Sequence, residues 1–371
     1  MKIPITRPWF GPKETRALVH PLETGWVAQG PEVKAFEEEF AEVVGAPHAC
    51  AVSNGTTALH LALVVAGVGP GDEVVTVSHT FIATANAVRH CGATPIFVDV
   101  DPTTLNMDPM ALEAALTPRT RAVLVPHQLG MPADLGELLP TAERLGIPVI
   151  EDAACALGSG IRWDRTWEAV GRPRGLLACF SFHPRKVITT GEGGMITSRR
   201  PELDRRLRVL RDQGRDPAAG ITEIGWNARM TDLQAALGRA QLRRLSEIVA
   251  RRRTLADLYG GLLATLPGIT PPSEPQNVRS NWQSYAVRVD PALNRDALVR
   301  HLNDAGVGAQ GGVMNAHEEA PYRDAPRPHP LHASEAARAR CMLLPLFPQM
   351  TEDEARYVVE VLAEGIAAQD N

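Results

Sequence analysis

Short apolar runs that alternate with helical stretches dominate residues 48–200 of this 371-residue chain. The apolar runs are rich in β-branched residues and lie at residues 74–77, 95–100, 122–125, 148–150, 179–182 and 195–197. Stretches with the composition and length of crossover helices lie at residues 56–66, 84–90, 109–116 and 135–145. Strands that are spaced by helices predict an α/β fold with a parallel sheet. Catalytic groups in such sheets gather at the carboxyl ends of the strands.

The pattern changes after residue 230. A long helical region with a dense arginine face extends from residue 230 to about residue 263 and meets a proline-rich break at residues 267–273. Residues 284–289 then alternate like a strand, residues 295–305 have helical spacing, and residues 351–354 form a capping box before a final helix. We therefore expect a large domain over residues 1–245 and a smaller α+β domain over residues 246–371.

The composition is that of a soluble globular protein with about two domains. The net charge is −5 and arginines are interleaved with acidic residues, which argues against nucleic-acid binding. Five cysteines lie far apart without CxxC pairs, which argues against a disulfide framework and favours a reducing cytoplasm. No apolar run approaches the roughly 20 residues of a membrane span, and the first residues lack the apolar core of a signal peptide. We therefore expect a cytoplasmic protein that binds neither nucleic acid nor membrane.

Lys186 is the most informative residue, because the chain uses arginine almost everywhere else. Of the 38 basic residues only four are lysine, and Lys186 is the sole lysine after Lys34. Arginine stays charged, whereas lysine can lose its proton and act as a nucleophilic amine. Residues 180–194 place this lysine between a predicted strand and a glycine-rich segment. Its scarcity and its setting predict a catalytic amine rather than a solvated surface charge.

Residues 53–57, Ser-Asn-Gly-Thr-Thr, end an apolar segment and begin a predicted helix. The glycine and the hydroxyls would present backbone N–H groups and the positive end of the helix dipole to an anion such as phosphate. The same residue types also serve as ordinary helix N-caps, so this segment alone is compatible with either role.

Glu151 and Asp152 follow the apolar run at residues 147–150 and place carboxylates at the active edge of the sheet. Two acids there could bind a metal, cap a helix or hold a cation. No cluster of His, Cys and acidic residues has the spacing of metal ligands, so no metal site is expected. Small residues after Asp152 leave space for a flat organic cation. We call the anion-binding segment at residues 53–57 the anion cup. A nucleophilic lysine, the anion cup and a carboxylate for a ring nitrogen together describe a site for pyridoxal 5'-phosphate.

Ordered motifs along nearly the whole chain resemble the DegT/StrS-type aminotransferases, which are fold-type I pyridoxal phosphate enzymes that act on nucleotide-linked keto-sugars. The motifs lie at residues 25–31, 36–37, 53–63, 80–84, 95–101, 108, 151–158, 180–194, 227–230, 234–238 and 344–346. The resemblance implies a three-layer α/β fold with a mostly parallel central sheet, in which the large domain binds the cofactor and the small domain completes the substrate site. It also implies transfer of an amino group from glutamate to a keto-sugar carried on a nucleotide, in a homodimer with shared active sites.

The resemblance also assigns roles to residues by their position. Lys186 would hold the cofactor through a Schiff base and carry the proton, and Asp152 would contact the pyridine nitrogen, so both are candidate catalytic residues. Phe81 would stack on the ring unless it packs in the core. Asn227 would reach the phosphate of the partner subunit unless it is a structural loop residue. The other candidate cofactor contacts are Gly55, Thr56, Thr57, Cys155 and Ser181, and the candidate substrate contacts are Trp26, His183, Arg229 and His317.

Two departures from the family pattern bear on this site. Many members carry Gln or His three residues after the aspartate, near the cofactor's phenolic oxygen, where this chain has Cys155. A thiol is a weak hydrogen-bond donor, so we expect a weaker contact there. Many relatives also carry His-Tyr-x-Pro-Leu-His after Gly-Ile-Gly, whereas here residues 306–308 lead to residues 312–319 without that pattern. This segment leaves the substrate open and does not affect the cofactor chemistry.

Three alternatives use the same scaffold. A dehydratase of this kind would carry histidine at the lysine position, and Lys186 argues against it. An aminotransferase for a non-nucleotide ketone, such as a keto-cyclitol, stays open. A non-catalytic regulator that senses a ligand is the third alternative, because a fold alone does not establish activity. The combination of Lys186, Asp152 and the anion cup disfavours it.

Overall fold

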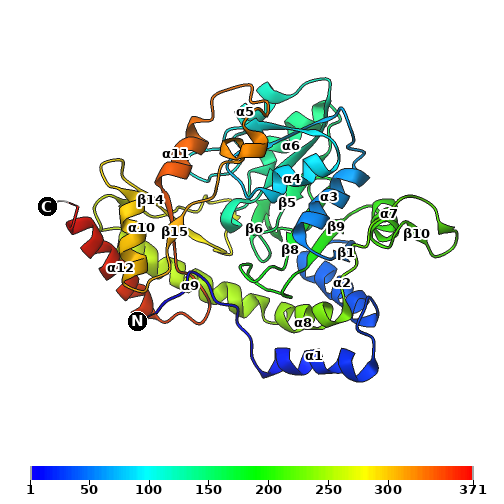
Figure 1. Cartoon of the computed structure of the whole chain (residues 1–371), viewed down its shortest axis with the longest axis horizontal. Helices are drawn as coiled ribbons and strands as arrows, with labels where there is room; N and C mark the ends of the chain where they lie inside the picture. Colours follow the sequence, from blue (N-terminus) through cyan, green and yellow to red (C-terminus); the bar gives the residue numbers. More distant parts are fainter. Residues whose placement is uncertain (1, 370–371) are drawn as a thin grey trace.

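The computed structural model describes residues 2–369, and a seven-stranded sheet forms the centre of this region (Figure 1). The strands, in spatial order, are β1 (His48–Val52), β9 (Gly194–Ser198), β8 (Leu177–Ser181), β5 (Val149–Asp152), β4 (Thr120–Pro126), β2 (Glu73–Val77) and β3 (Thr94–Val98). Neighbours pair in parallel except at β9, which is antiparallel to both β1 and β8. The expected parallel sheet is confirmed with this one exception. Strand β9 runs backwards because a loop without a crossover helix joins it to β8.

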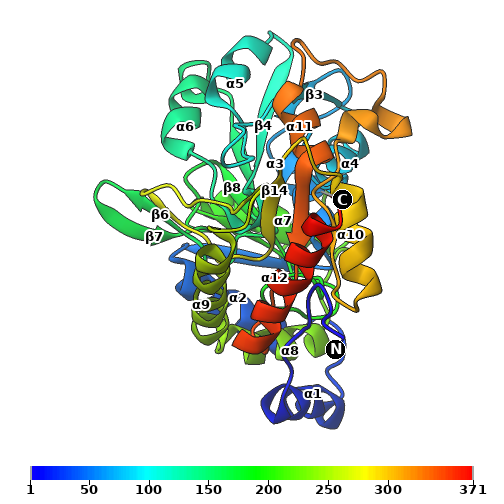
Figure 2. The ribbon, with the colours of Figure 1, turned by 90° about the vertical axis from the view of Figure 1, so that its left-hand side faces the viewer.

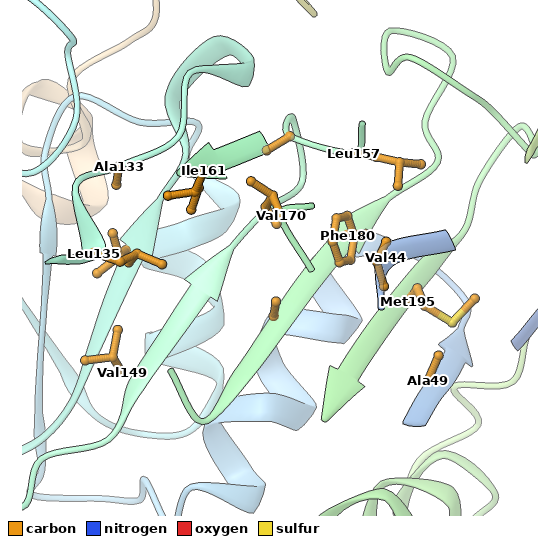
Figure 3. Close-up of a cluster of buried hydrophobic side chains, with 14 of the residues drawn as sticks. Val44, Ala49, Ala133, Leu135, Val149, Leu157, Ile161, Val170, Phe180 and Met195 are labelled. Carbon is orange, nitrogen blue, oxygen red and sulfur yellow. The ribbon is translucent and has the colours of Figure 1, made fainter. Parts of the chain in front are cut away.

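Two clusters of buried apolar side chains cover the two faces of the main sheet. On one face, strand residues such as Val123 and Phe180 pack with four helices, and Figure 3 shows part of this cluster. These helices are α2 (Pro31–Val44), α5 (Pro109–Ala115), α6 (Leu135–Arg144) and α8 (Asp232–Leu242). On the other face, residues such as Val74 and Leu124 pack with α3 (Gly55–Val65), α4 (Ala83–His90) and α7 (Pro201–Arg211). Helices on both faces of a buried sheet confirm the expected three-layer α/β fold.

A second sheet, of four strands within the described chain, lies in the C-terminal third. Its strands, in spatial order, are β12 (Ile269–Thr270), β14 (Tyr285–Val289), β16 (Cys341–Leu344) and β15 (Gln310–Gly311), and adjacent strands are antiparallel. A separate apolar cluster joins this sheet to α9 (Leu245–Leu263), α10 (Arg295–Asp304) and α12 (Glu352–Ala367). This smaller α+β part agrees with the sequence pattern, and Thr351 forms the expected capping box with Glu354.

Helix α9 contributes to both apolar cores. Leu245 and Ile248 belong to the core of the main sheet, whereas Leu255 and Tyr259 belong to the core of the second sheet. Ile3, near the other end of the chain, also belongs to the second core. The division into domains 1–245 and 246–371 therefore stays a prediction.

The helical region predicted from residue 230 to about residue 263 is two helices, because α8 ends at Leu242 and α9 begins at Leu245. Arg244 leaves the helical conformation between them, with φ −106° and ψ 1°. Its guanidinium donates to Glu14 Oε1 and to the carbonyl oxygen of Trp9. The interruption between α8 and α9 therefore coincides with contacts to the N-terminal segment. No local sequence pattern reveals these contacts.

Besides β1, α2, α7, β12, β15 and β16, several further elements were not expected from the sequence pattern. They are α1 (Pro12–Thr24), β6 (Gly160–Trp163), β7 (Thr166–Ala169), β10 (Arg215–Asp216), β11 (Gly220–Ile221), β13 (Val278–Arg279), η1 (Gln128–Gly130), η2 (Ala316–Glu318), η3 (Ala320–Tyr322) and α11 (His332–Arg340). Helix α1 packs on α8 at the outside of the molecule (Figures 1 and 2). Among residues 2–369, no helix has both the length and the apolar composition that a membrane span requires.

Candidate active site

The carboxyl ends of the parallel strands meet at one edge of the main sheet. Strands β8, β5, β4 and β2 are consecutive neighbours with the same direction, and β1 shares this direction because it also pairs antiparallel with β9. The segments that leave this edge are residues 53–57, 78–82, 152–155 and 182–193. This edge therefore holds most of the residues that the sequence singled out as candidates.

Lys186 lies in the loop after β8, and its side chain is half-buried. Its backbone N–H donates to the carbonyl oxygen of His183 at 2.8 Å, which closes a turn. Its amine donates to Cys155 Sγ at 3.2 Å. Within residues 2–369, no carboxylate forms an ion pair with this amine. The amine of Lys186 is therefore not held in a salt bridge by the described part of its own chain.

Asp152 is the last residue of β5, and only 7% of it is exposed. Its carboxylate accepts hydrogen bonds from Thr84 Oγ1 at 2.8 Å and from the N–H of Ala154 at 3.2 Å. Burial raises the pKa of this carboxyl, against the opposing effect of these bonds and of the positive charge of Lys186. Asp152 is thus a buried carboxylate without a cation in direct contact among the described residues.

Glu151 precedes Asp152 in the strand but has a structural role. Its carboxylate accepts hydrogen bonds from the N–H groups of Arg174 at 2.8 Å and Gly175 at 3.0 Å, and it lies 3.3 Å from His127 Nε2. Successive side chains of a strand point to opposite faces, which separates the two acids. Within residues 2–369, no group of three or more His, Cys, Asp or Glu side chains is arranged to hold a metal ion.

The segment at residues 53–57 forms the N-terminus of α3. Asn54 is the N-cap, and its side chain accepts a hydrogen bond from the N–H of Thr57 at 2.8 Å. The capping role is therefore confirmed, and it leaves the N–H groups of Gly55 and Thr56 without an intrahelical partner. A Cβ atom at Gly55 would lie 2.7 Å from Ser181 Cβ, so only glycine permits this close approach. The first turn of α3 and the Ser181 hydroxyl thus share one small region.

Phe81 lies in the loop after β2, and 66% of it is exposed. It does not pack in the core, so the core-packing alternative is wrong. Trp26, which is 58% exposed, follows the end of α1 in a different part of the chain. The contacts within the described chain do not connect Trp26 to Lys186 or Asp152.

Asn227 and Arg229 flank a contact with the anion cup. The carbonyl oxygen of Ala228, between them, accepts a hydrogen bond from the N–H of Ser53 at 2.9 Å. Asn227 is exposed, and Arg229 forms an ion pair with Asp212. The backbone of this segment therefore lies beside the cup of its own chain, while Asn227 is exposed in the single chain.

The two candidate histidines differ in their surroundings. His183 is half-buried in the turn that precedes Lys186, and its Nδ1 accepts a hydrogen bond from the N–H of Arg185 at 3.2 Å. His317 is buried, and its Nδ1 lies 2.6 Å from Ser78 Oγ. Burial lowers the pKa of the His317 imidazole, which favours its neutral form. His183 thus lies near the candidate amine, whereas His317 packs against the end of β2.

Sequence reasoning did not single out three residues that contact this edge. Thr84 donates to Asp152, Asn281 donates to the carbonyl oxygen of Cys155 at 2.8 Å, and Gln283 donates to that of Arg185 at 2.8 Å. The polar run at residues 280–284, directly before a strand, was a signal for the latter two. Their targets are main-chain groups more than 90 residues away, which no local pattern identifies.

Residues 10–363 match the model of the DegT/DnrJ/EryC1/StrS aminotransferase family. The chain is 36% identical to the spore coat polysaccharide biosynthesis protein SpsC of Bacillus subtilis (strain 168), over 99% of this chain and 98% of that protein. Among solved structures, it is similar to the aminotransferase TlmJ from Streptoalloteichus hindustanus, with a TM-score of 0.93 and 36% identity over 99% of this chain and 100% of that one.

It is also similar to the structure of 3-amino-5-hydroxybenzoic acid synthase, with a TM-score of 0.91 and 32% identity over 99% of each chain. Two further structures, of one aminotransferase from Streptococcus pneumoniae, are a PLP-form and a PMP-form of that protein. Each has a TM-score of 0.93 and 26% identity over 100% of both chains. The PLP-form structure is named for the cofactor that the candidate residues of this chain suggest.

Proposed function

Because this chain belongs to the DegT/DnrJ/EryC1/StrS aminotransferase family, we propose that it transfers an amino group from glutamate to the ketone of a nucleotide-linked sugar. It is a pyridoxal phosphate-dependent aminotransferase. The name of the SpsC relative refers to polysaccharide biosynthesis, which supports a sugar as the acceptor here.

One observation carries the proposal: Lys186 and Asp152 are two oppositely charged groups at the same sheet edge that lack an ion-pair partner in contact. The Lys186 amine has only the Cys155 thiol as a hydrogen-bond partner among residues 2–369, and the Asp152 carboxylate is buried. Pyridoxal phosphate offers an aldehyde to the amine and a protonated ring nitrogen to the carboxylate. The free N–H groups at Gly55 and Thr56 suit its phosphate. The residues present therefore fit this cofactor.

The chain's own residues would hold the reactants and move the proton. When bound, pyridoxal phosphate supplies an electron-withdrawing ring that stabilises negative charge on the reacting carbon. The Lys186 amine would take a proton from the amino-bearing carbon of the donor and later return one to the ketone carbon of the acceptor. The Asp152 carboxylate would keep the ring nitrogen protonated, and the Thr84 hydroxyl would orient that carboxylate through its 2.8 Å hydrogen bond.

A panel of acceptors tests the substrate proposal. Amino transfer from glutamate is measured with nucleotide-linked keto-sugars, with the corresponding free keto-sugars and with keto-cyclitols. We expect the nucleotide-linked ketones to have the highest kcat/KM. Turnover of cyclitol ketones alone would replace the sugar proposal, and turnover only with another amino donor would replace glutamate.

A second candidate substrate, a ketone without a nucleotide, has one structural observation in its favour. Two polar side chains of the divergent segment at residues 312–319 turn toward the end of β2, where His317 contacts Ser78 and Asn315 Oδ1 lies 2.9 Å from His79 Nδ1. These side chains are less free to hold a nucleotide. The similarity to 3-amino-5-hydroxybenzoic acid synthase supports the same alternative.

The role of Cys155 is tested by its replacement with glutamine. We expect Cys155→Gln to remain active and to shift the visible absorption of the bound cofactor, because an amide donates a stronger hydrogen bond than a thiol. Absorption spectra across a pH titration measure this shift, and Cys155→Ala separates the loss of the thiol from the gain of the amide. Complete loss of activity in Cys155→Gln alone would mean that the pocket requires the smaller side chain.

We further propose that the active species is a homodimer in which Asn227 reaches the phosphate site of the partner subunit. Large apolar side chains beside Asn227 support a partner at this surface, since Ile224 is 89% exposed and Ile221 is 65% exposed in the single chain. The hydrogen bond between Ala228 and Ser53 holds the same segment near the cup of its own chain. An experiment must therefore distinguish the two subunits as the source of Asn227.

Subunit mixing makes this distinction. We expect the Lys186→Ala and Asn227→Ala proteins each to be impaired, and a mixture of them to regain activity once subunits exchange. Each heterodimer would then contain one site with both lesions and one site with neither. Mass spectrometry of the intact dimers measures the exchange. Confirmed exchange without regained activity would mean that Asn227 acts within its own subunit or not at all.

A further inference from the structure

The polar segment at residues 280–284 enters the candidate active site from the C-terminal part of the chain. It precedes β14, and its two amide residues, Asn281 and Gln283, are buried. Trp282, between them, has a φ of 50°, a left-handed conformation that non-glycine residues rarely adopt. Such a conformation persists only where the surrounding contacts hold it, so this segment has a defined shape.

The two amides hold the two loops that carry the candidate chemistry. Asn281 Nδ2 donates to the carbonyl oxygens of Cys155 and Leu157, both at 2.8 Å, in the segment that follows Asp152. Gln283 Nε2 donates to the carbonyl oxygen of Arg185 at 2.8 Å, in the peptide that leads to Lys186. One short segment therefore contacts the backbone on both sides of the 3.2 Å contact between Lys186 and Cys155.

The backbone of this segment is held by a hydrogen bond within the segment and by hydrogen bonds from Arg252. The backbone N–H of Gln283 donates to Asn281 Oδ1 at 2.8 Å, so the Asn281 side chain also holds the backbone at Gln283. The guanidinium of Arg252, which is fully buried, donates to the carbonyl oxygens of Trp282 at 3.0 Å, Gln283 at 3.3 Å and Leu346 at 3.0 Å. Burial lowers the pKa of Arg252 to about 10, and no carboxylate pairs with it among the described residues. A single nitrogen of Arg252, Nη1, makes these three bonds, and two of its acceptors are main-chain oxygens of the 280–284 segment.

We propose that Asn281 and Gln283 are positioning residues that set the relative placement of the Lys186 loop and the Cys155 loop. The lysine side chain is flexible, so the location of its amine depends on where the backbone of its loop is held. A small displacement of a reacting group is enough to cost a large factor in rate. This inference rests on the proposed catalytic role of Lys186.

Gln283→Met tests the proposal, because methionine has a similar length and no donor. The matched control is Gln349→Met, since Gln349 Nε2 also donates to a main-chain carbonyl, that of Pro8 at 3.0 Å. We expect Gln283→Met to lower kcat about tenfold, with cofactor content and the KM for the amino donor nearly unchanged. Gln349→Met is expected to keep the wild-type kcat. Equal kcat values for the two variants would overturn the proposal.

Lysine labelling of the cofactor-free protein gives a readout that does not depend on turnover. The chain has only four lysines, so few labelled sites have to be resolved. An acylating reagent followed by mass spectrometry compares the labelling of Lys186 with that of Lys34, whose side chain is 78% exposed. We expect the rate of Lys186 labelling relative to Lys34 to rise several-fold in Gln283→Met and to stay unchanged in Gln349→Met. An unchanged ratio in Gln283→Met would contradict a positioning role.

Gln283→Glu adds a rescue experiment in which only the donor is varied. An ionised glutamate cannot donate to the Arg185 carbonyl oxygen, whereas a protonated one can. We therefore expect the kcat of this variant, relative to wild type, to recover as the pH falls toward the pKa of the new carboxyl. A ratio that is independent of pH would oppose the proposal. An active Lys186→Ala enzyme would instead overturn the proposed function, so the two failures are distinguishable.

Discussion

Replacement of Lys186 by alanine is expected to abolish both amino transfer and the visible absorption band of the Schiff base between the lysine and the cofactor. The amine is the group that would hold the cofactor covalently and carry the proton, and alanine can do neither. Because general acid–base catalysis alone contributes about 10²–10⁴-fold, we expect activity to fall by at least about a thousandfold. Absorption spectroscopy and a transamination assay on the same preparation measure the two losses together.

Two companion variants separate this effect from a change of charge or of fold. Lys186→Arg keeps the charge but not the nucleophile, so we expect it to be as inactive as Lys186→Ala. Lys34→Ala removes an exposed lysine that lies 3.9 Å from Glu38, and we expect wild-type behaviour. Retention of both absorption and activity in Lys186→Ala would refute the assignment of this residue.

Asp152→Asn is expected to bind the cofactor but to lose most of its turnover. An uncharged amide cannot stabilise a protonated ring nitrogen, whereas a buried carboxylate can. The loss of a charged hydrogen bond in such a site commonly costs a few kcal/mol, which corresponds to roughly a hundredfold or more in rate. Cofactor content after gel filtration and kcat under saturating substrates measure the two parts of this prediction.

The control for Asp152→Asn is Asp108→Asn, at the N-cap of α5, where an asparagine oxygen can accept the same hydrogen bond from Met110. We expect this variant to keep full activity. Thr84→Val, which removes the hydroxyl that donates to Asp152, should cause a smaller loss than Asp152→Asn. Near wild-type turnover of Asp152→Asn would place the partner of the ring nitrogen elsewhere.

The chain's local patterns were sufficient for six of the seven strands of the main sheet and for helices α3, α4, α5 and α6, but not for β1 or α7. The run at residues 122–125 is part of β4, and the stretch at residues 135–145 is α6 but for its last residue. These elements follow from apolar periodicity and caps, which depend on neighbouring residues. The direction of β9 and the break between α8 and α9 were not predicted, because each depends on distant contacts.

The candidate site likewise has residues that the sequence singles out and contacts that only the tertiary structure shows. Lys186 stands out by its scarcity, Asp152 by its position after an apolar run, and residues 53–57 by their capping chemistry. The 3.2 Å contact between Lys186 and Cys155 and the hydrogen bond from Thr84 to Asp152 join residues 31 and 68 positions apart. Such contacts have no signature in one sequence, since either residue could serve many partners.

The sequence by itself thus determined most strands of the main sheet, the edge at which the candidate residues lie and the residue types for the cofactor, because periodicity and residue chemistry are local properties. Only the tertiary structure decided how these groups are held. It buries Asp152 without a cation in contact, turns His317 toward Ser78, and brings Asn281 and Gln283 to the backbone of the two loops. The physical reason is that burial and hydrogen-bond partners are set by the packing of segments far apart in the chain.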